Sequence, residues 1–248
     1  MTTMRRTLLS FGLLVGSSPF LERLAAQTDP APPATDSVGD LPLSVLPAPD
    51  GPLLAVLLTG DGGWAAGDKS VAKAFAARNV AVVGLSSPRY LSQRRTPDEA
   101  AAALARIMRH FLRAWNRERV LVVGYSRGAD IGPFMVSRLP ADLRRRVDLL
   151  VLLGPGEQAS FKFGVLDLIR APHGGDELPV APEVALLHGV PVLCIYGQSD
   201  RNAICPALER AGLARVLVRD GGHVVHGDEG PALVRAILDA LPTKPARS

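Results

Sequence analysis

The sequence predicts an α/β fold with a mostly parallel central sheet and helices on both faces. Short, continuous apolar runs alternate along the chain with longer segments that carry helix signals. Strands buried on both faces of a parallel sheet have this continuous apolar character. The chain has 248 residues, of which 47% are hydrophobic, and this suits one α/β domain with a sizeable core. We therefore expect one domain over residues 41–248.

Each continuous apolar run is expected to form one strand of this sheet. In chain order these runs are Ala55–Leu58, Val80–Leu85, Val120–Val123, Val147–Leu153, Val190–Tyr196 and Ala214–Val218. The stretch from Gly154 to Pro182 fits the alternation poorly, because it mixes Pro, Gly and residues of different polarity. We expect it to be an insertion over the carboxyl edge of the sheet, where ligands bind in such folds.

Helices are expected between these runs. The first follows the apolar run at 55–58 and has Asp68 as its N-cap. The clearest start is at Thr96–Glu99, where a Thr cap, a Pro at the first helical position and a Glu three residues after the cap coincide. That helix is expected to end near Trp115. Two more are expected over Arg127–Leu139 and Glu229–Leu241.

The N-terminus has the features of an export signal. Arg5-Arg6 precede a short apolar segment, and small residues at 24–26 offer a cleavage site. We interpret residues 1–26 as a signal peptide and residues 27–40 as a linker; a disordered or amphipathic tail is the alternative. No apolar run is long enough to span a bilayer, so the protein is not expected to span the membrane after cleavage.

The balance of basic and acidic residues indicates which classes of partner the protein can bind. Lys and Arg exceed Asp and Glu by 28 to 24, giving a net charge of +4. Apart from Arg144-Arg145-Arg146 the basic residues are scattered and lack interleaved aromatic residues. This excludes nucleic acid as an expected partner, whereas an anionic membrane surface or an anionic substrate fits.

The two cysteines, Cys194 and Cys205, are eleven residues apart. In an exported protein they are candidates for a disulfide, and the alternative is two buried thiols. Their spacing is not that of a metal site, and no metal or organic cofactor is expected.

The strongest chemical signal is Gly124-Tyr125-Ser126-Arg127-Gly128, a G-x-S-x-G pattern between a strand and a helix. In that context the two glycines permit a sharp turn that exposes the serine hydroxyl above the sheet. Ser126 is therefore the candidate nucleophile. The N–H of Arg127 is expected to point into the same space.

A serine nucleophile needs a base and a residue that orients the base. Asp200 follows one later strand and His223 follows the next, which is the order Ser, acid, His that this topology uses. Asp220 is the alternative acid and His226 the alternative base. We prefer Asp200, because Asp220 is too near His223 in sequence to orient it, and His223, because it directly follows two glycines.

The stretch T-G-D-G-G-W-A-A-G-D-K-S at 59–70 admits two interpretations. A phosphate-binding loop requires Gly-Lys-Ser, but here Asp68 separates Gly67 from Lys69. The loop instead fits the second arm of an oxyanion hole, with the N–H of Asp61 or Gly62 as donor. The Asp61 carboxylate either shapes the turn or binds a substrate ammonium group, and we also expect Trp64 and Tyr125 to contact substrate.

With these residues in place, the chain resembles the VirJ/AcvB family of exported bacterial α/β-hydrolases. The resemblance covers about residues 41–241 and includes T-G-D-G-G-W, T-P-D-E, G-Y-S-R-G-A-D, L-L-G-P, C-I-Y-G and G-G-H. It implies the α/β-hydrolase fold, with Ser126 as nucleophile, Asp200 as acid and His223 as base. Arg127 departs from the aromatic residue expected within the serine motif, and V-V-H-G-D after His223 departs from the H-F-D-G-D expected there.

The resemblance also implies a function and a location. It implies a periplasmic enzyme of a Gram-negative bacterium that hydrolyses aminoacylated phosphatidylglycerol, an anionic lipid, and releases lysine or alanine. Two alternatives remain open: a general periplasmic carboxylesterase, and a non-catalytic accessory of an envelope or secretion complex with unknown protein partners.

Overall fold

The computed structural model of the protein describes residues 38–163 and 177–242. The predicted signal peptide, most of the predicted linker, part of the predicted insertion and the last six residues lie outside this range. Among the described helices, none has both the length and the apolar character needed to cross a membrane.

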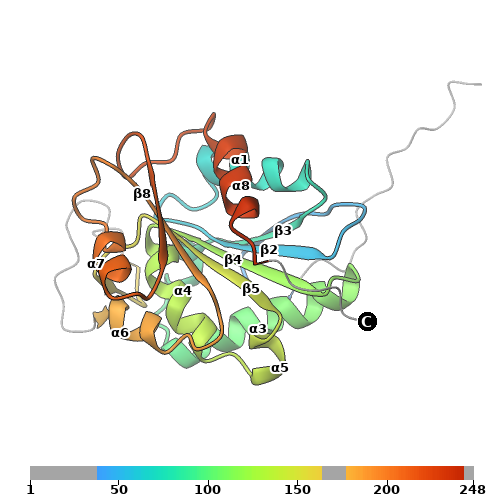
Figure 1. Cartoon of the computed structure of the whole chain (residues 1–248). Coiled ribbons are helices and arrows are strands. Elements are labelled where there is room, and N and C mark those ends of the chain that lie inside the picture. Colours follow the sequence, from blue (N-terminus) through green and yellow to red (C-terminus); the bar gives the residue numbers. More distant parts are fainter. Residues whose placement is uncertain (1–37, 164–176, 243–248) are drawn as a thin grey trace, which may run out of the picture. The chain divides into compact units, whose positions relative to one another are not determined.

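The described residues form a seven-stranded sheet in the order β1-β3-β2-β4-β5-β8-β9, seen edge-on in the middle of the molecule (Figure 1). Its strands are β1 (Leu43–Leu46), β2 (Leu53–Leu58), β3 (Ala81–Leu85), β4 (Arg119–Tyr125), β5 (Val147–Leu153), β8 (Val192–Gly197) and β9 (Arg215–Arg219). Among the strand pairs of this sheet in the described residues, β1–β3 alone is antiparallel. The six predicted strands are thus confirmed, with ends that differ by at most two residues, and β1 is an antiparallel edge strand that we did not predict.

Helices connect the strands. They are α1 (Ala66–Ala76), α2 (Ser87–Tyr90), α3 (Pro97–Ala114), α4 (Arg127–Ser137), α5 (Ala141–Arg144), α6 (Val180–Ala185), α7 (Cys205–Arg210) and α8 (Gly230–Asp239). Between β5 and α6, two short strands, β6 (Gln158–Ala159) and β7 (Leu178–Pro179), form a separate antiparallel pair. The predicted insertion therefore contains local structure of its own.

The sheet is covered on both faces, as predicted. α1 and α8 lie on one face and α3 and α4 on the other (Figure 1). Successive residues of β2 alternate between the two cores, since Ala55 and Leu57 pack on the α1 and α8 side whereas Val56 and Leu58 pack on the other. A continuous apolar run is needed because both sides of each strand are buried.

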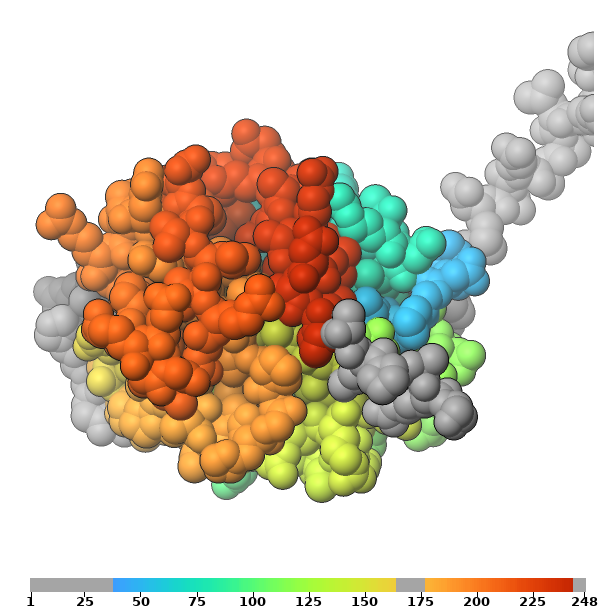
Figure 2. All heavy atoms as spheres, viewed as in Figure 1, coloured from blue at the N-terminus to red at the C-terminus, as the bar shows by residue number. Residues whose placement is uncertain are grey.

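The α1–α8 layer is closely packed. A Cβ on Gly230, at the start of α8, would lie 2.3 Å from the Ser70 hydroxyl oxygen of α1. The space-filling view shows the red C-terminal segment directly against the cyan segment that contains α1 (Figure 2). Since α8 follows the loop after β9, this contact also fixes where that loop ends.

The start of α3 confirms the predicted capping box. The backbone N–H of Glu99 donates to Thr96 Oγ1 at 3.1 Å, and the N–H of Thr96 donates to Glu99 Oε2 at 2.7 Å. Two of the helix's otherwise unpaired donors are thereby satisfied.

The predicted cap of α1 was wrong. Ala65, not Asp68, is the N-cap, so the helix begins earlier and Asp68 lies in its first turn. The Asp68 carboxylate accepts from the N–H of Ala65 at 3.3 Å, which is the role of the third residue in a capping box. The sequence was misleading because Ala65 has no side-chain acceptor, so the only polar signal lay inside the helix.

Candidate active site

Ser126 occupies a sharp turn between β4 and α4. Its φ and ψ are 51° and −121°, a backbone conformation that residues other than glycine seldom adopt. Its N–H donates to the carbonyl oxygen of Leu153 at the end of β5, at 2.9 Å. The strained backbone is thus held by the neighbouring strand, and such strain in a strand-to-helix turn is typical of a nucleophile elbow.

The two glycines of the G-x-S-x-G motif are required by close backbone contacts. A Cβ on Gly124 would lie 2.3 Å from the carbonyl oxygen of Gly128, and a Cβ on Gly128 would lie 2.0 Å from the carbonyl oxygen of Leu58. No side chain fits at either position. The motif therefore lets α4 begin directly over the ends of β4 and β2.

The structure brings the three predicted residues Ser126, His223 and Asp200 together. His223 Nε2 lies 2.9 Å from Ser126 Oγ, and His223 Nδ1 lies 2.8 Å from Asp200 Oδ2. The Asp200 side chain is only 4% exposed, whereas that of His223 is 42% exposed. A buried carboxylate behind an accessible imidazole is the arrangement that fixes the imidazole tautomer and leaves the nucleophile open to substrate.

The alternative acid and base lie elsewhere. Asp220 and His226 are both exposed. The backbone N–H of His226 donates to Glu229 Oε2 at 2.7 Å, where it helps to begin α8. Of the histidines in the described ranges, His223 is the one within hydrogen-bond distance of Ser126.

Gly154, at the end of β5, makes room for the imidazole. Its φ is +59°, and a Cβ there would lie 3.0 Å from His223 Nδ1 and 3.6 Å from Asp200 Oδ2. Gly154 lies in the L-L-G-P motif, but the sequence alone did not indicate a role for it. Its position directly after a strand was the signal, because side chains at that edge face the site.

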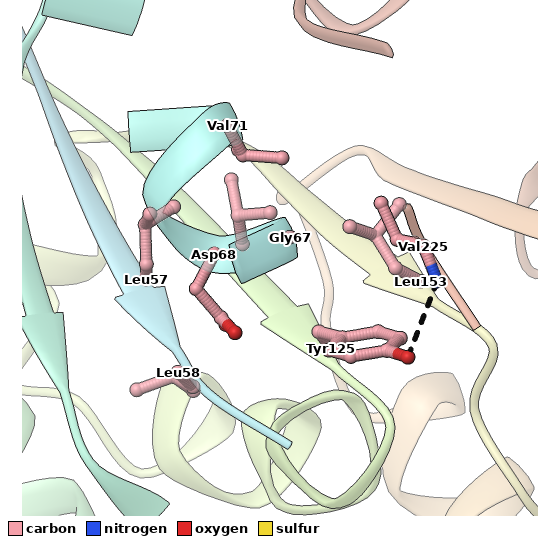
Figure 3. Close-up of a pocket in the computed structure, with 9 residues that line it drawn as sticks. Leu57, Leu58, Gly67, Asp68, Val71, Tyr125, Leu153 and Val225 are labelled. Atoms are coloured by element: carbon pink, nitrogen blue, oxygen red, sulfur yellow. Dashed lines mark hydrogen bonds between the residues drawn. The ribbon is translucent and has the colours of Figure 1, made fainter. Parts of the chain in front are cut away.

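Tyr125 supports the loop that carries His223. The two rings stack with centroids 5.8 Å apart. The tyrosine hydroxyl donates to the His223 carbonyl oxygen and accepts from the N–H of Val225, both at 3.4 Å, and Figure 3 shows the second bond. The structure therefore places Tyr125 beneath the loop as a support, while its predicted contact with substrate stays a prediction.

Asp68 lies in the small apolar pocket behind Tyr125, together with Gly67, Val71 and Val225 (Figure 3). Burial raises the pKa of its carboxyl to about 6, and the hydrogen bond from Ala65 partly opposes this. Gly67 is needed here, because a Cβ would lie 2.6 Å from the Val225 carbonyl oxygen. The start of α1 thus rests on the histidine loop.

The proposed oxyanion loop lies against the nucleophile. A Cβ on Gly60 would be 3.2 Å from Ser126 Cβ and equally close to the Tyr125 ring. Within residues 38–163 and 177–242, the N–H groups of Asp61, Gly62 and Arg127 have no protein acceptor. This is the condition expected of donors kept for a reacting oxygen.

The side chains of Asp61 and Arg127 pair with each other. Arg127 Nε contacts Asp61 Oδ1, and Arg127 Nη2 lies 3.2 Å from Asp61 Oδ2. The Arg127 side chain is 7% exposed and that of Asp61 is 34% exposed. The carboxylate that we expected either to shape the turn or to bind an ammonium group therefore already has a guanidinium partner.

Trp64 packs on the sheet. A Cβ on Gly84 of β3 would lie 2.1 Å from its ring, so the glycine is what allows the indole to pack against the strand. The predicted contact of Trp64 with substrate stays a prediction.

Asp130, in the first turn of α4, is a residue that sequence reasoning missed. Its Oδ1 accepts from the N–H of Gly156 at 2.7 Å, which ties α4 to the segment that follows Gly154. Desolvation raises the pKa of this carboxyl to about 7, while Arg127 acts to lower it and Asp61 to raise it.

The predicted disulfide is confirmed. Cys194 of β8 and Cys205, the first residue of α7, are joined with their Cα atoms 5.5 Å apart. The closed loop contains Asp200. Within the described ranges, no three His, Cys, Asp or Glu side chains are grouped as ligands for a metal ion.

Comparisons with known proteins identify the family and the fold. Residues 52–245 match the family described as Bacterial virulence protein (VirJ). No curated protein matches the sequence.

Solved structures similar to the chain are α/β-hydrolases. MenH from S. aureus has a TM-score of 0.59 at 14% identity, covering 79% of this chain and 96% of its own. Esterase PE8 has a TM-score of 0.55 at 21% identity, with coverages of 82% and 99%. Naproxen esterase from Bacillus subtilis has a TM-score of 0.56 at 13% identity, with coverages of 79% and 86%. At these identities the likeness establishes the α/β-hydrolase fold, as predicted.

Proposed function

The chain is a member of the VirJ family of bacterial virulence proteins, and from this premise we propose that it is a serine hydrolase that cleaves an ester through Ser126. The observation that carries the proposal is the continuous set of hydrogen bonds from Ser126 Oγ through the His223 ring to Asp200. A serine at its ordinary pKa is a weak nucleophile, and this arrangement is the one that activates it.

In the proposed reaction each residue has a defined role. His223 Nε2 takes the proton from Ser126 Oγ as that oxygen attacks the ester carbonyl, and Asp200 stabilises the imidazolium through Nδ1–H. The N–H groups of Arg127 and of Asp61 or Gly62 stabilise the tetrahedral oxyanion. The alcohol leaves with the proton from Nε2, and a water molecule then hydrolyses the acyl-enzyme by the same steps.

A fluorophosphonate probe tests the proposal directly, because it labels only an activated serine. We expect the purified protein to be labelled and Ser126→Ala not to be, with turnover of a p-nitrophenyl ester lost in parallel. Absence of labelling and of turnover in the wild type would refute the enzyme proposal and favour a non-catalytic accessory of an envelope complex.

We further propose that the substrate is the aminoacyl ester of an anionic phospholipid, such as lysyl- or alanyl-phosphatidylglycerol. The support is the family resemblance, together with the net charge of +4, which suits an anionic surface. The test is release of lysine or alanine from vesicles that contain these lipids. Release from neither, with normal turnover of a simple ester, would leave a general carboxylesterase.

We also propose a periplasmic location. The Cys194–Cys205 disulfide supports it, because such bonds persist in oxidising compartments and are rare in the cytosol. Fractionation of cells that express the full chain tests this, and recovery of the protein only in the cytosol with free thiols would contradict it.

A further inference from the structure

The two arms of the proposed oxyanion hole are joined by a side-chain ion pair. Arg127 is the residue after the nucleophile, and Asp61 belongs to the loop after β2. Each is expected to contribute a backbone N–H, or to adjoin the residue that does. Their side chains pair in a two-point contact, Nε to Oδ1 and Nη2 to Oδ2. A guanidinium fork that meets a carboxylate in this way fixes orientation as well as distance.

The surroundings of the pair favour a structural contact over a substrate contact. The Arg127 guanidinium carbon lies 5.2 Å from the centroid of the Phe163 ring, and the side chain is 7% exposed. A bulky substrate reaches such a group only if the pair opens. Because the Arg127 side chain is so little exposed, opening the pair would leave its buried charge without a partner, which is costly.

The loop of Asp61 has few other ties to the nucleophile elbow. Its backbone hydrogen bonds are internal, from Gly63 N–H to the Gly60 carbonyl and from Ala65 N–H to the Gly63 carbonyl. The exception is the Thr59 N–H, which donates to Leu85 at the end of β3 and not to the elbow. Gly60 lies close to Ser126, since a Cβ added to it would be 3.2 Å from Ser126 Cβ, but no hydrogen bond joins the two residues. Within the described residues, the ion pair is thus the link between this loop and α4 that is formed by polar side chains.

We propose that the Asp61–Arg127 pair is a positioning device that holds the two oxyanion donors at a fixed separation. The proposal rests on the proposed function, since it assigns no role without a reacting carbonyl at Ser126. It predicts that the pair acts on the rates of acylation and deacylation and leaves ground-state binding unchanged, because a tetrahedral oxyanion forms in both of these steps but not in the ground-state complex.

The test uses Asp61→Asn and Arg127→Met with a neutral p-nitrophenyl ester as substrate. We expect kcat and the rate of acylation to fall by about 10- to 100-fold, since loss of one oxyanion donor costs about 100- to 1,000-fold and here the donors are only loosened. KM should change by less than about 3-fold. Arg127→Lys should recover part of the loss, because it keeps the charge but not the fork.

The same helix provides a matched control. Arg138, at the other end of α4, pairs with Glu183, and there too one side chain is 8% exposed and the other 33% exposed. Glu183→Gln and Arg138→Lys should disturb stability much as the test variants do, yet leave kcat within about 2-fold because that pair touches neither proposed donor.

Two outcomes would overturn the proposal. If kcat is unchanged in Asp61→Asn while wild-type turnover and fluorophosphonate labelling are normal, the pair does not position the donors. If the loss falls on KM and only for an ester that carries an ammonium group, Asp61 binds substrate instead. Failure of the wild type to turn over any ester is a different result, because it refutes the proposed function itself.

Discussion

The two sides of the candidate site are held in different ways. On the acid–base side, a disulfide closes the loop that contains Asp200, and Tyr125 holds the backbone of the His223 loop. On the oxyanion side, a two-point ion pair joins Asp61 to Arg127. The first side therefore depends on covalent and backbone contacts, and the second on charge. The acid–base side and the oxyanion side should therefore lose their geometry under different perturbations.

The largest effect is expected from the acid–base residues themselves. His223→Gln should lower kcat/KM by at least about 1,000-fold and abolish fluorophosphonate labelling, since serine triads lose about four to six orders of magnitude when the base is removed. Asp200→Asn should cost less than loss of the base, because it disturbs the tautomer but leaves Ser126 and His223 in place. His226→Gln and Asp220→Asn are the controls, and a loss of similar size in either would mean that the site is assigned wrongly.

The next largest effect is expected at Gly154, which lies beside the imidazole of His223. Gly154→Ala should reduce kcat about 10- to 100-fold, because its Cβ would press on His223 Nδ1 at 3.0 Å and displace the ring. Gly212→Ala is a matched control, since Gly212 has φ +68° and nothing within 4 Å of the added Cβ. If both variants lose the same activity, backbone strain and not displacement of the imidazole is the cause.

Removing the disulfide should have a smaller effect, and mainly on the acid–base side. The variant with both Cys194→Ser and Cys205→Ser should lose about 3 kcal/mol of unfolding free energy, measured in urea, because closure of a loop of this length restricts the unfolded chain. Turnover should fall in step as the Asp200 loop loosens. Full activity of the variant would show that the bridge stabilises the fold without positioning the acid.

The smallest effect on turnover is expected from Asp130, in the first turn of α4, where the change falls on the pH dependence of stability. Its folded-state pKa of about 7 exceeds the ordinary value of 3.8, so the folded protein binds more protons than the unfolded chain between these values. Stability from this group is therefore complete below about pH 4 and is lost as the pH rises toward 7. Asp130→Asn should flatten this decline in urea unfolding measured at several pH values, and an unchanged slope would contradict the assignment.

Much of the site was predictable because parallel strands bring their carboxyl ends to one edge. The G-x-S-x-G motif, Asp200 and His223 each follow a strand, so sequence order was enough to group them. The pairing of Cys194 with Cys205 was a candidate because the sequence has the features of an export signal and two cysteines, and the structure decided it against two free thiols.

The features of the site that we did not predict depend on where side chains point, which the order of residues along the chain does not reveal. Asp61 seemed free to meet a substrate amine, because nothing in the sequence places the Arg127 side chain across from it. Trp64 seemed available to substrate, because its fit on Gly84 appears only once β3 is in place. Asp68 looked like a helix cap, because Ala65 carries no polar signal of its own.

The strand order sets how far the histidine must reach. His223 leaves from β9, whereas Ser126 stands on β4, with β8 and β5 between them. Three strand spacings amount to roughly 14 Å, which is far longer than an imidazole side chain. The loop after β9 must therefore fold back across the sheet edge, and it can do so because β5 is followed by Gly154, which presents no side chain to block it. One missing Cβ thus sets the path of the loop, so its length is tightly constrained, and inserting a single residue between β9 and His223 should separate base from nucleophile without altering any residue of the triad.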